Sequence, residues 1–323
     1  REQQLETSPD VAVASTLNET SSLLDPSRVG FAQHDRTLSV DKKYQQPPSR
    51  RRRINNIRPR RDRHNSASDK PQHLVLATWN ARSINKKVED CKQIFDDRNV
   101  DLLAITETWH ENYDSSCIRR LRAHGFTVVE QAREAPSKQT DLNWTNHGGV
   151  AIIARQGVRI TKIKLGVAVS SLEYLCSRVS TGGGAFTLLT VYRPGSKSAD
   201  NKFYTDFRSL LEKLICYSGK VIVTGDINIR LERPSDATSI KLNDLLADVG
   251  CTQWVDKPTH DAGGLLDVLI TRSADGPFGP EVIDIGLSDH RMLRTLIDIT
   301  RPQPVYETIT SRAWRNFDLN AFR

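Results

Sequence analysis

The chain has 323 residues, enough for one large domain or two ordinary ones, and only 37% of them are hydrophobic. This low apolar fraction predicts that part of the chain does not fold into a core. The net charge is +7, but residues 41–70 carry +8 and residues 1–40 carry −3, so the remainder is nearly neutral. There is no secretory leader and no apolar run near the roughly 18 residues that span a bilayer, so we expect neither secretion nor a membrane partner.

The first 70 residues are rich in Ser, Gln, Asn, Asp and Arg and show no sustained hydrophobic period. We therefore expect a disordered basic arm over residues 1–70. Its clearest features are the arginine-rich runs at 50–53 and 58–61. One interpretation of these runs is solvated charge without a partner. The functional interpretation is a nuclear-import signal or a nonspecific contact to nucleic-acid phosphates, and it predicts a nuclear protein.

From residue 73 onward, short runs rich in Val, Ile and Thr alternate with helical patterns. The predicted strands are Leu74–Trp79, Asp101–Thr106, Gly149–Ala154, Tyr174–Val179, Phe186–Tyr192, Val221–Gly225, Leu266–Thr271 and Met292–Ile299. The predicted helices are Val88–Arg98, Ser116–His124, Asp200–Tyr217 and Ile240–Val249. This α/β pattern over residues 71–300 favours a two-sheet sandwich flanked by helices, although its periodicity equally allows a doubly wound sheet.

The spacing of the cysteines indicates the redox compartment, and the first residue indicates whether the reading frame is complete. Five cysteines lie far apart without CxxC spacing, which argues against a disulfide framework and a zinc site and predicts a reducing compartment. The chain begins with Arg rather than Met, so we expect it to be a piece of a longer reading frame.

Polar residues follow several of the apolar strands, and strand ends project side chains into a common crevice from a rigid base. The first predicted strand leads to Asn80, the second to Glu107, and the fifth ends at Tyr192. Taken singly, a strand-end Asn is usually a turn former and a lone Glu is usually a surface residue.

The second half of the chain adds three more polar signals. One strand opens into Gly225-Asp226-Ile227-Asn228, and Ser288-Asp289-His290 precedes the last strand. Each alone is more often structural, but finding both in one chain is far less expected by chance. Asp267 lies within an otherwise apolar strand, where a carboxylate should not be buried without a partner.

These motifs resemble the endonuclease/exonuclease/phosphatase superfamily, which includes the apurinic/apyrimidinic (AP) endonucleases, DNase I and inositol polyphosphate phosphatases. Within it, the chain resembles most the AP-like endonuclease of non-LTR (LINE-type) retrotransposons. The phrases that carry the resemblance are Trp79-Asn80-Ala81-Arg82-Ser83, Ala104-Ile105-Thr106-Glu107-Thr108-Trp109, His147-Gly148-Gly149-Val150-Ala151, Val191-Tyr192-Arg193-Pro194-Gly195, Gly225-Asp226-Ile227-Asn228, Lys257-Pro258-Thr259-His260 and Leu287-Ser288-Asp289-His290.

The resemblance implies a four-layer α/β sandwich with the site at one edge. It also implies Mg²⁺, with Mn²⁺ as an alternative, held by Glu107, Asn80 and Asp289. Oxygen ligands of this kind suit either ion.

It implies a role for each remaining motif residue. Asp226 would orient or deprotonate the attacking water, and Asn228 would hold a phosphate oxygen. His290 would contact the scissile phosphate, held in position by Asp267, and Tyr192 would bind the phosphate or the leaving oxygen. Thr259 and Ser288 are expected supporting contacts to the substrate.

Two departures from the family pattern bear on which branch the chain resembles and on how it would bind phosphate. Arg82 stands where repair AP endonucleases place an acid, which points towards the retrotransposon branch. Gly195 stands where a phosphate-binding Asn is often found, so one phosphate contact is expected to be missing.

The function implied is an endonuclease that nicks one strand of duplex DNA and leaves a 3′-hydroxyl for target-primed reverse transcription. The basic arm is an expected contact for the RNA of the element, and residues 301–323 resemble a linker towards a downstream reverse transcriptase. Two alternatives remain open. One is another phosphohydrolase of the superfamily, acting on inositol phosphates, sphingomyelin or RNA, and the other is a decayed element that binds nucleic acid without catalysis.

Overall fold

The computed structural model describes residues 73–133, 146–196, 198–276 and 278–302. All described elements belong to one unit of the chain, Asn65–Arg323. The basic arm expected over residues 1–70 and all but the first two residues of the expected linker lie outside the described residues.

Within these ranges, the strands form two mixed sheets of six strands each. The first sheet has the order β11-β12-β1-β2-β4-β3 and the second has the order β5-β6-β7-β8-β10-β9. The strands of the first sheet are β11 (Glu281–Ile283), β12 (Met292–Thr300), β1 (His73–Asn80), β2 (Leu102–Thr106), β4 (Val150–Ala154) and β3 (Thr127–Gln131). Those of the second are β5 (Arg159–Ile163), β6 (Glu173–Thr181), β7 (Gly184–Tyr192), β8 (Lys220–Asp226), β10 (Asp267–Arg272) and β9 (Cys251–Gln253).

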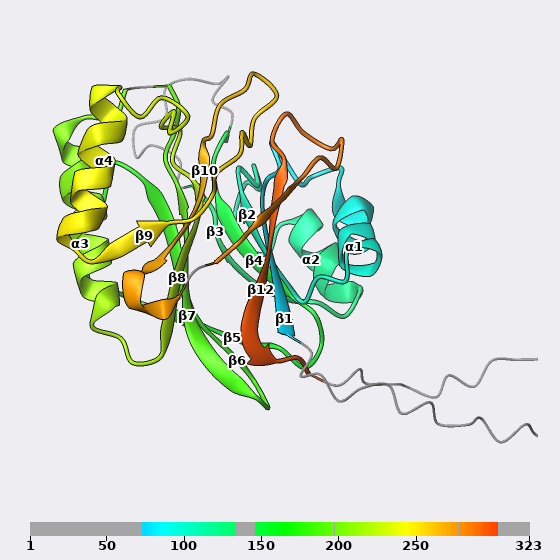
Figure 1. The fold of residues 1–323 in the computed structure, drawn as a ribbon. Coiled ribbons are helices and arrows are strands. Elements are labelled where there is room, and N and C mark those ends of the chain that lie inside the picture. The colour runs from blue at the N-terminus through cyan, green and yellow to red at the C-terminus, as the bar shows by residue number, and fades with distance from the viewer. Residues whose placement is uncertain (1–72, 134–145, 197, 277, 303–323) are drawn as a thin grey trace, which may run out of the picture. The chain divides into compact units, whose positions relative to one another are not determined.

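Four α-helices flank the two sheets in the described part of the chain, two on each outer side (Figure 1). Helices α1 (Val88–Asp97) and α2 (Ser116–Ala123) pack on the first sheet, and α3 (Asn201–Ile215) and α4 (Ala237–Asp248) pack on the second. The side chain of Asp200 caps α3 by accepting a hydrogen bond of 2.9 Å from the backbone N–H of Phe203. The result is a sandwich of four layers.

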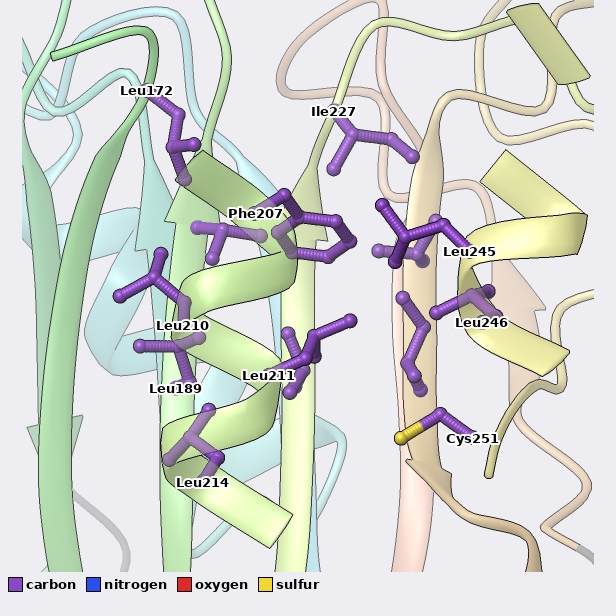
Figure 2. Close-up of a cluster of buried hydrophobic side chains, with 14 of the residues drawn as sticks. Leu172, Leu189, Phe207, Leu210, Leu211, Leu214, Ile227, Leu245, Leu246 and Cys251 are labelled. Carbon is purple, nitrogen blue, oxygen red and sulfur yellow. The ribbon is translucent and has the colours of Figure 1, made fainter. Parts of the chain in front are cut away.

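Three apolar clusters fill the spaces between these layers. One lies between the two sheets and includes Leu76, Leu188 and Ile222. Another holds α1 and α2 against the first sheet. The third holds α3 and α4 against the second sheet, and Figure 2 shows Phe207 and Leu211 of α3 facing Leu245 of α4. The face of α3 that carries Phe203, Phe207, Leu210, Leu211 and Leu214 is therefore the buried one.

Two parallel strand pairs decide where the polar strand ends meet. Strand β1 runs parallel to β2, and β7 runs parallel to β8. The carboxyl ends of each pair therefore lie at the same edge of their sheet, with Asn80 opposite Thr106 and Tyr192 opposite Asp226. This topology places polar residues from four separate strands at one edge of the sandwich.

A hydrogen bond between buried threonines joins the two sheets just below that edge. The hydroxyls of Thr78 in β1 and Thr224 in β8 are 2.7 Å apart. Thr224 gives its own proton to the carbonyl of Val268, so Thr78 donates to Thr224. Each threonine lies two residues before a polar strand end, and this bond therefore fixes the spacing of Asn80 and Asp226.

The predicted sandwich is confirmed, and the doubly wound alternative is wrong because the strands divide into two packed sheets. All eight predicted strands are present. Four further strands, β3, β5, β9 and β11, were not predicted, and all four are edge strands. None of the five cysteines, all of which are described, forms a disulfide. No helix in the described ranges is long and apolar enough to cross a membrane.

Candidate active site

Asn80 links the two sheets at the polar edge. Its Nδ2 donates a hydrogen bond of 2.9 Å to Oε1 of Glu107 and one of 2.8 Å to Oδ2 of Asp226. Its Oδ1 accepts the backbone N–H of Arg82 at 3.1 Å. Asn80 is fully buried, so one amide side chain holds two carboxylates from different sheets in a fixed relation.

Glu107 follows β2 in a backbone conformation that few side chains adopt, with φ of +50°. Its carboxylate is partly exposed and also accepts the indole N–H of Trp109 at 3.2 Å. The turn is pinned to the segment after β1, because the backbone N–H of Ser83 donates to the carbonyl of Glu107 at 2.8 Å. A residue held this way presents its carboxylate to the site with little freedom.

The turn after β8 holds Asp226. Gly225 has φ of +134°, and a Cβ there would overlap the carbonyl of Val191, so only glycine allows β8 to approach β7 this closely. Asp226 is fully buried, and its Oδ1 accepts the backbone N–H of Asn228 at 2.9 Å. Its Oδ2 also accepts Nδ2 of Asn228 at 3.1 Å. Asn228 therefore donates a hydrogen bond to each oxygen of the Asp226 carboxylate and holds it in place.

Arg193 braces the same turn and was not assigned a role from the sequence. It is almost fully buried, and its guanidinium donates to the carbonyls of Ile227 and Asn228, each at 2.6 Å. Gly195 follows closely, and a Cβ at this position would lie 2.8 Å from Oδ1 of Asn228. The departure from the family pattern at Gly195 thus leaves room for the Asn228 side chain.

Asp267 and His290 form a buried pair beside Asp226. Nδ1 of His290 lies 2.8 Å from Oδ2 of Asp267, and its Nε2 lies 3.9 Å from Oδ2 of Asp226. Asp267 pairs with Asp226 across β10 and β8. Both carboxylates and the imidazole are at most 6% exposed, and the three residues bring ligand atoms within 4.8 Å of one another.

Thr259 and Ser288 support this pair in the structure. The hydroxyl of Thr259 accepts the backbone N–H groups of Leu266 and Asp267, each at 3.1 Å. The hydroxyl of Ser288 accepts the indole N–H of Trp79 at 2.8 Å and lies 2.7 Å from the carbonyl of Asn80. Their hydroxyls therefore hold the backbone around the site in place.

Burial and neighbouring charge set the protonation of the site. Burial and the charge of Asp267 raise the pKa of Asp226. Burial alone would lower the pKa of His290, but the hydrogen bond to Asp267 and the surrounding carboxylates raise it to about 9. Burial and the charges of Glu107 and Asp226 raise the pKa of Tyr192, so its hydroxyl stays protonated. The histidine is therefore a cation at neutral pH.

This raised pKa predicts a pH-dependent stability in the absence of divalent ions. Because the folded pKa of His290 exceeds its value of 6.5 in an unfolded chain, its contribution is fully present below that value and is lost as the pH rises through about 9. We expect His290→Gln to remove the part of this pH dependence that the histidine contributes, on the order of 3 kcal/mol, while Asp226, whose pKa is also raised, keeps its own part. Urea unfolding in EDTA near pH 6 and near pH 10 measures it, with His124→Gln as a surface control. An unchanged pH dependence in His290→Gln would contradict the assignment.

Asp289 lies beside two basic residues. Nη1 of Arg82 donates to its Oδ2 at 2.6 Å, and Nε2 of His260 lies 3.3 Å from the same oxygen. The rings of His260 and His290 meet edge to face at 4.8 Å between centroids. Neither Arg82 nor His260 was assigned to the site from the sequence. The motif Lys257-Pro258-Thr259-His260 was the available signal, but only its threonine was singled out.

The residues on the Glu107 side fit a divalent metal ion. Glu107 and Asp226 offer carboxylate oxygens, which suit Mg²⁺ or Mn²⁺. Asn80 turns its Nδ2 towards both carboxylates and its Oδ1 towards the backbone N–H of Arg82. The raised pKa of Asp226 shows that the surroundings supply too little positive charge to this buried carboxylate. A cation bound beside Asn80 would supply that charge.

The chain is similar in sequence and in fold to known proteins. A sequence model of the Endonuclease/Exonuclease/phosphatase family matches residues 77–290, from β1 to His290. A curated protein of Drosophila melanogaster, the probable RNA-directed DNA polymerase from transposon BS, is 22% identical over 157 residues. The match covers 49% of this chain but only 15% of that protein, so the chain spans a small part of this relative.

Solved structures share the fold. The 3′ phosphatase NExo from Neisseria, bound to a product DNA hairpin, has a TM-score of 0.52 at 16% identity, covering 70% of this chain and 99% of that one. The endonuclease domain of TRAS1, a telomere-specific non-LTR retrotransposon, has a TM-score of 0.50 at 15% identity, covering 71% and 100%. The human Nocturnin catalytic domain has a TM-score of 0.54 at 12% identity, covering 71% and 94%.

Proposed function

Because the chain belongs to the endonuclease/exonuclease/phosphatase family, we propose that residues 71–300 form a magnesium-dependent DNA endonuclease. It would nick one strand of duplex DNA and leave a 3′-hydroxyl that a reverse transcriptase extends. The observation that carries the proposal is the hydrogen-bonded chain from Glu107 through Asn80 to Asp226, with the pair Asp267–His290 beside it. A carboxylate, a cationic imidazole and an oxygen-ligand site are the groups that phosphodiester hydrolysis requires.

Each group has a task that follows from its surroundings. Asp226 would orient the attacking water and accept its proton, because Asn80 and Asn228 hold this buried carboxylate in a fixed position. His290, kept protonated by Asp267, would donate to a phosphate oxygen. Tyr192 would donate its hydroxyl proton in a hydrogen bond to the phosphate or the leaving oxygen. A divalent ion held by Glu107, beside Asn80, would neutralise charge that develops on the phosphate.

Both the DNA substrate and the retroelement origin are supported by the similar proteins. The NExo structure contains a DNA hairpin product, and the TRAS1 domain is an endonuclease of a non-LTR retrotransposon. The curated relative is a polymerase from a transposon. These likenesses agree with the phrases in the sequence that resemble the retrotransposon branch.

The chemistry of the nicked ends tests this proposal. We expect purified full chain to nick a plasmid in Mg²⁺, and DNA polymerase to extend the nicks without prior phosphatase treatment. Hydrolysis of an inositol phosphate, sphingomyelin or single-stranded RNA, with the plasmid left intact, would favour another phosphohydrolase of the family. DNA binding without cleavage of any of these substrates would indicate a non-catalytic remnant.

A role in binding nucleic acid and in nuclear import is proposed for the basic arm. Deleting residues 1–70 should leave the cleavage rate on short duplexes nearly unchanged. It should weaken nonspecific DNA binding and flatten its salt dependence, by about 0.9 in log–log slope for each phosphate that the arm no longer neutralises. Fluorescence anisotropy of a labelled duplex over a range of salt concentrations measures this slope. An equal slope in both proteins would show that the arm does not bind phosphates.

A further inference from the structure

The carboxylate of Asp289 already has a cation bound to it from within the chain. The guanidinium of Arg82 and the imidazole of His260 both contact the same oxygen, Oδ2, at 2.6 Å and 3.3 Å. The other oxygen, Oδ1, is shielded from solvent and makes no hydrogen bond within the described residues. An ion approaching Asp289 from solvent would therefore have to compete for Oδ2.

The backbone of Arg82 is held by the turn that also positions the other half of the site. Its N–H donates to Oδ1 of Asn80 at 3.1 Å. The flanking N–H groups of Ala81 and Ser83 donate to the carbonyls of Thr106 and Glu107, at 3.0 Å and 2.8 Å. The backbone from which the guanidinium extends is therefore fixed, and the side chain, which is 52% exposed, is held by its bond to Asp289.

The group formed by His260, Asp289 and His290 would otherwise be able to hold a metal ion. Their ligand atoms lie within 4.8 Å of one another. A divalent ion in this group would sit against the guanidinium of Arg82 and would also have to displace the proton on the cationic imidazole of His290. The positive charge already present therefore disfavours the ion. On the other side of the site, the hydrogen bonds that the described residues give to Glu107 and Asp226 come from neutral donors of Asn80, Trp109, Tyr192 and Asn228. The cation beside Asp226 is His290, whose Nε2 lies 3.9 Å from its Oδ2.

We propose that Arg82 serves as the fixed cation of Asp289, so that this chain binds one divalent ion, beside Asn80, and not a second at Asp289. The inference rests on the proposed function, because it concerns the metal ions of the same site. It assigns Arg82 a positioning and charge-balancing role and removes Asp289 from the expected ligand set.

Counting bound ions tests the inference without a measurement of activity. Mn²⁺ is titrated into the full chain, and the free ion is followed by electron paramagnetic resonance. We expect wild type and Arg82→Lys to bind one ion and Arg82→Asn to bind two. Asn suits this position because Arg82 has φ of +42°, which Asn tolerates better than most residues. Arg82→Gln should behave like Arg82→Asn and serves as its replacement should Asn unfold the chain.

A control variant and a double variant are included in the same ion count. Arg120→Asn is the matched control, because Arg120 also pairs with an acid, Glu89, and is equally exposed, at 51% against 52% for Arg82. It should still bind one ion. Combining Glu107→Ala with Arg82→Asn should leave one ion, at Asp289.

The outcomes separate this inference from the function on which it rests. Two ions in wild type, or one ion in both Arg82→Asn and Arg82→Gln, would overturn the inference alone. No ion in wild type would contradict the proposed metal dependence as well.

Discussion

Replacing Glu107 with alanine is expected to lower the nicking rate by at least roughly 10³-fold, because a lost metal ligand removes several kcal/mol of charge stabilisation from the transition state. The Glu107 side chain is partly exposed, and its contacts with Asn80, Trp109 and Tyr192 are hydrogen bonds. Its removal should therefore leave the melting temperature nearly unchanged. Single-turnover nicking of a supercoiled plasmid and thermal melting measure the two effects.

A conservative variant and a control sharpen this test. Glu107→Gln keeps the shape and an acceptor for Asn80 but loses the charge, so we expect a loss close to that of Glu107→Ala. Glu111→Ala removes an exposed acid four residues away and should cleave like wild type. Near wild-type cleavage by Glu107→Ala in Mg²⁺ would show that Glu107 is not a ligand.

The second large effect concerns the pair Asp267–His290. Asp267→Asn keeps the shape of the side chain but changes what it offers to Nδ1 of His290, at 2.8 Å in the structure, and favours the wrong histidine tautomer. His290→Ala removes the cation itself. We expect each to lower single-turnover nicking by at least roughly 10²-fold. The double variant should lose little more than either single variant, because the two residues act as one unit.

Stability must be separated from mechanism here, because Asp267 is only 1% exposed and its replacement can lower the folded fraction. Rates are therefore normalised to the folded fraction. Thr259→Val is the structural comparison, since the hydroxyl of Thr259 accepts the backbone N–H of Asp267. Losses that multiply in the double variant would mean that the residues act independently. Normal cleavage by folded Asp267→Asn would make Asp267 a structural acid only.

Strands whose residues are all buried could be predicted from the sequence. The interior strands such as β2 and β4 are buried at every position, so they appear in the sequence as unbroken apolar runs. The missed strands β3 and β5 lie at sheet edges, where exposed and buried positions mix and the signal fades. The choice between two sheets and one depended on which strands pair, and periodicity carries no such information.

The same reasoning explains what could be anticipated of the site. Asn80, Glu107 and Asp226 could be grouped because each follows an apolar strand, and parallel pairing brings such ends together. The contact between Arg82 and Asp289 joins positions 207 residues apart and depends on one arginine rotamer, so no local pattern indicated it. His260 follows no predicted strand and reaches the site through its bridge to His290 and its contact with Asp289.

The conversion of supercoiled plasmid to open circles by the full chain tests whether this site makes the chain a metal-dependent endonuclease. We expect conversion in Mg²⁺, none in EDTA, and recovery when Mg²⁺ is added back. Asp226→Asn and Glu107→Ala, each shown to be folded by thermal melting, should leave the plasmid supercoiled in Mg²⁺. Equal nicking in EDTA, or nicking by folded Asp226→Asn at the wild-type rate, would contradict a metal-dependent endonuclease built on this site.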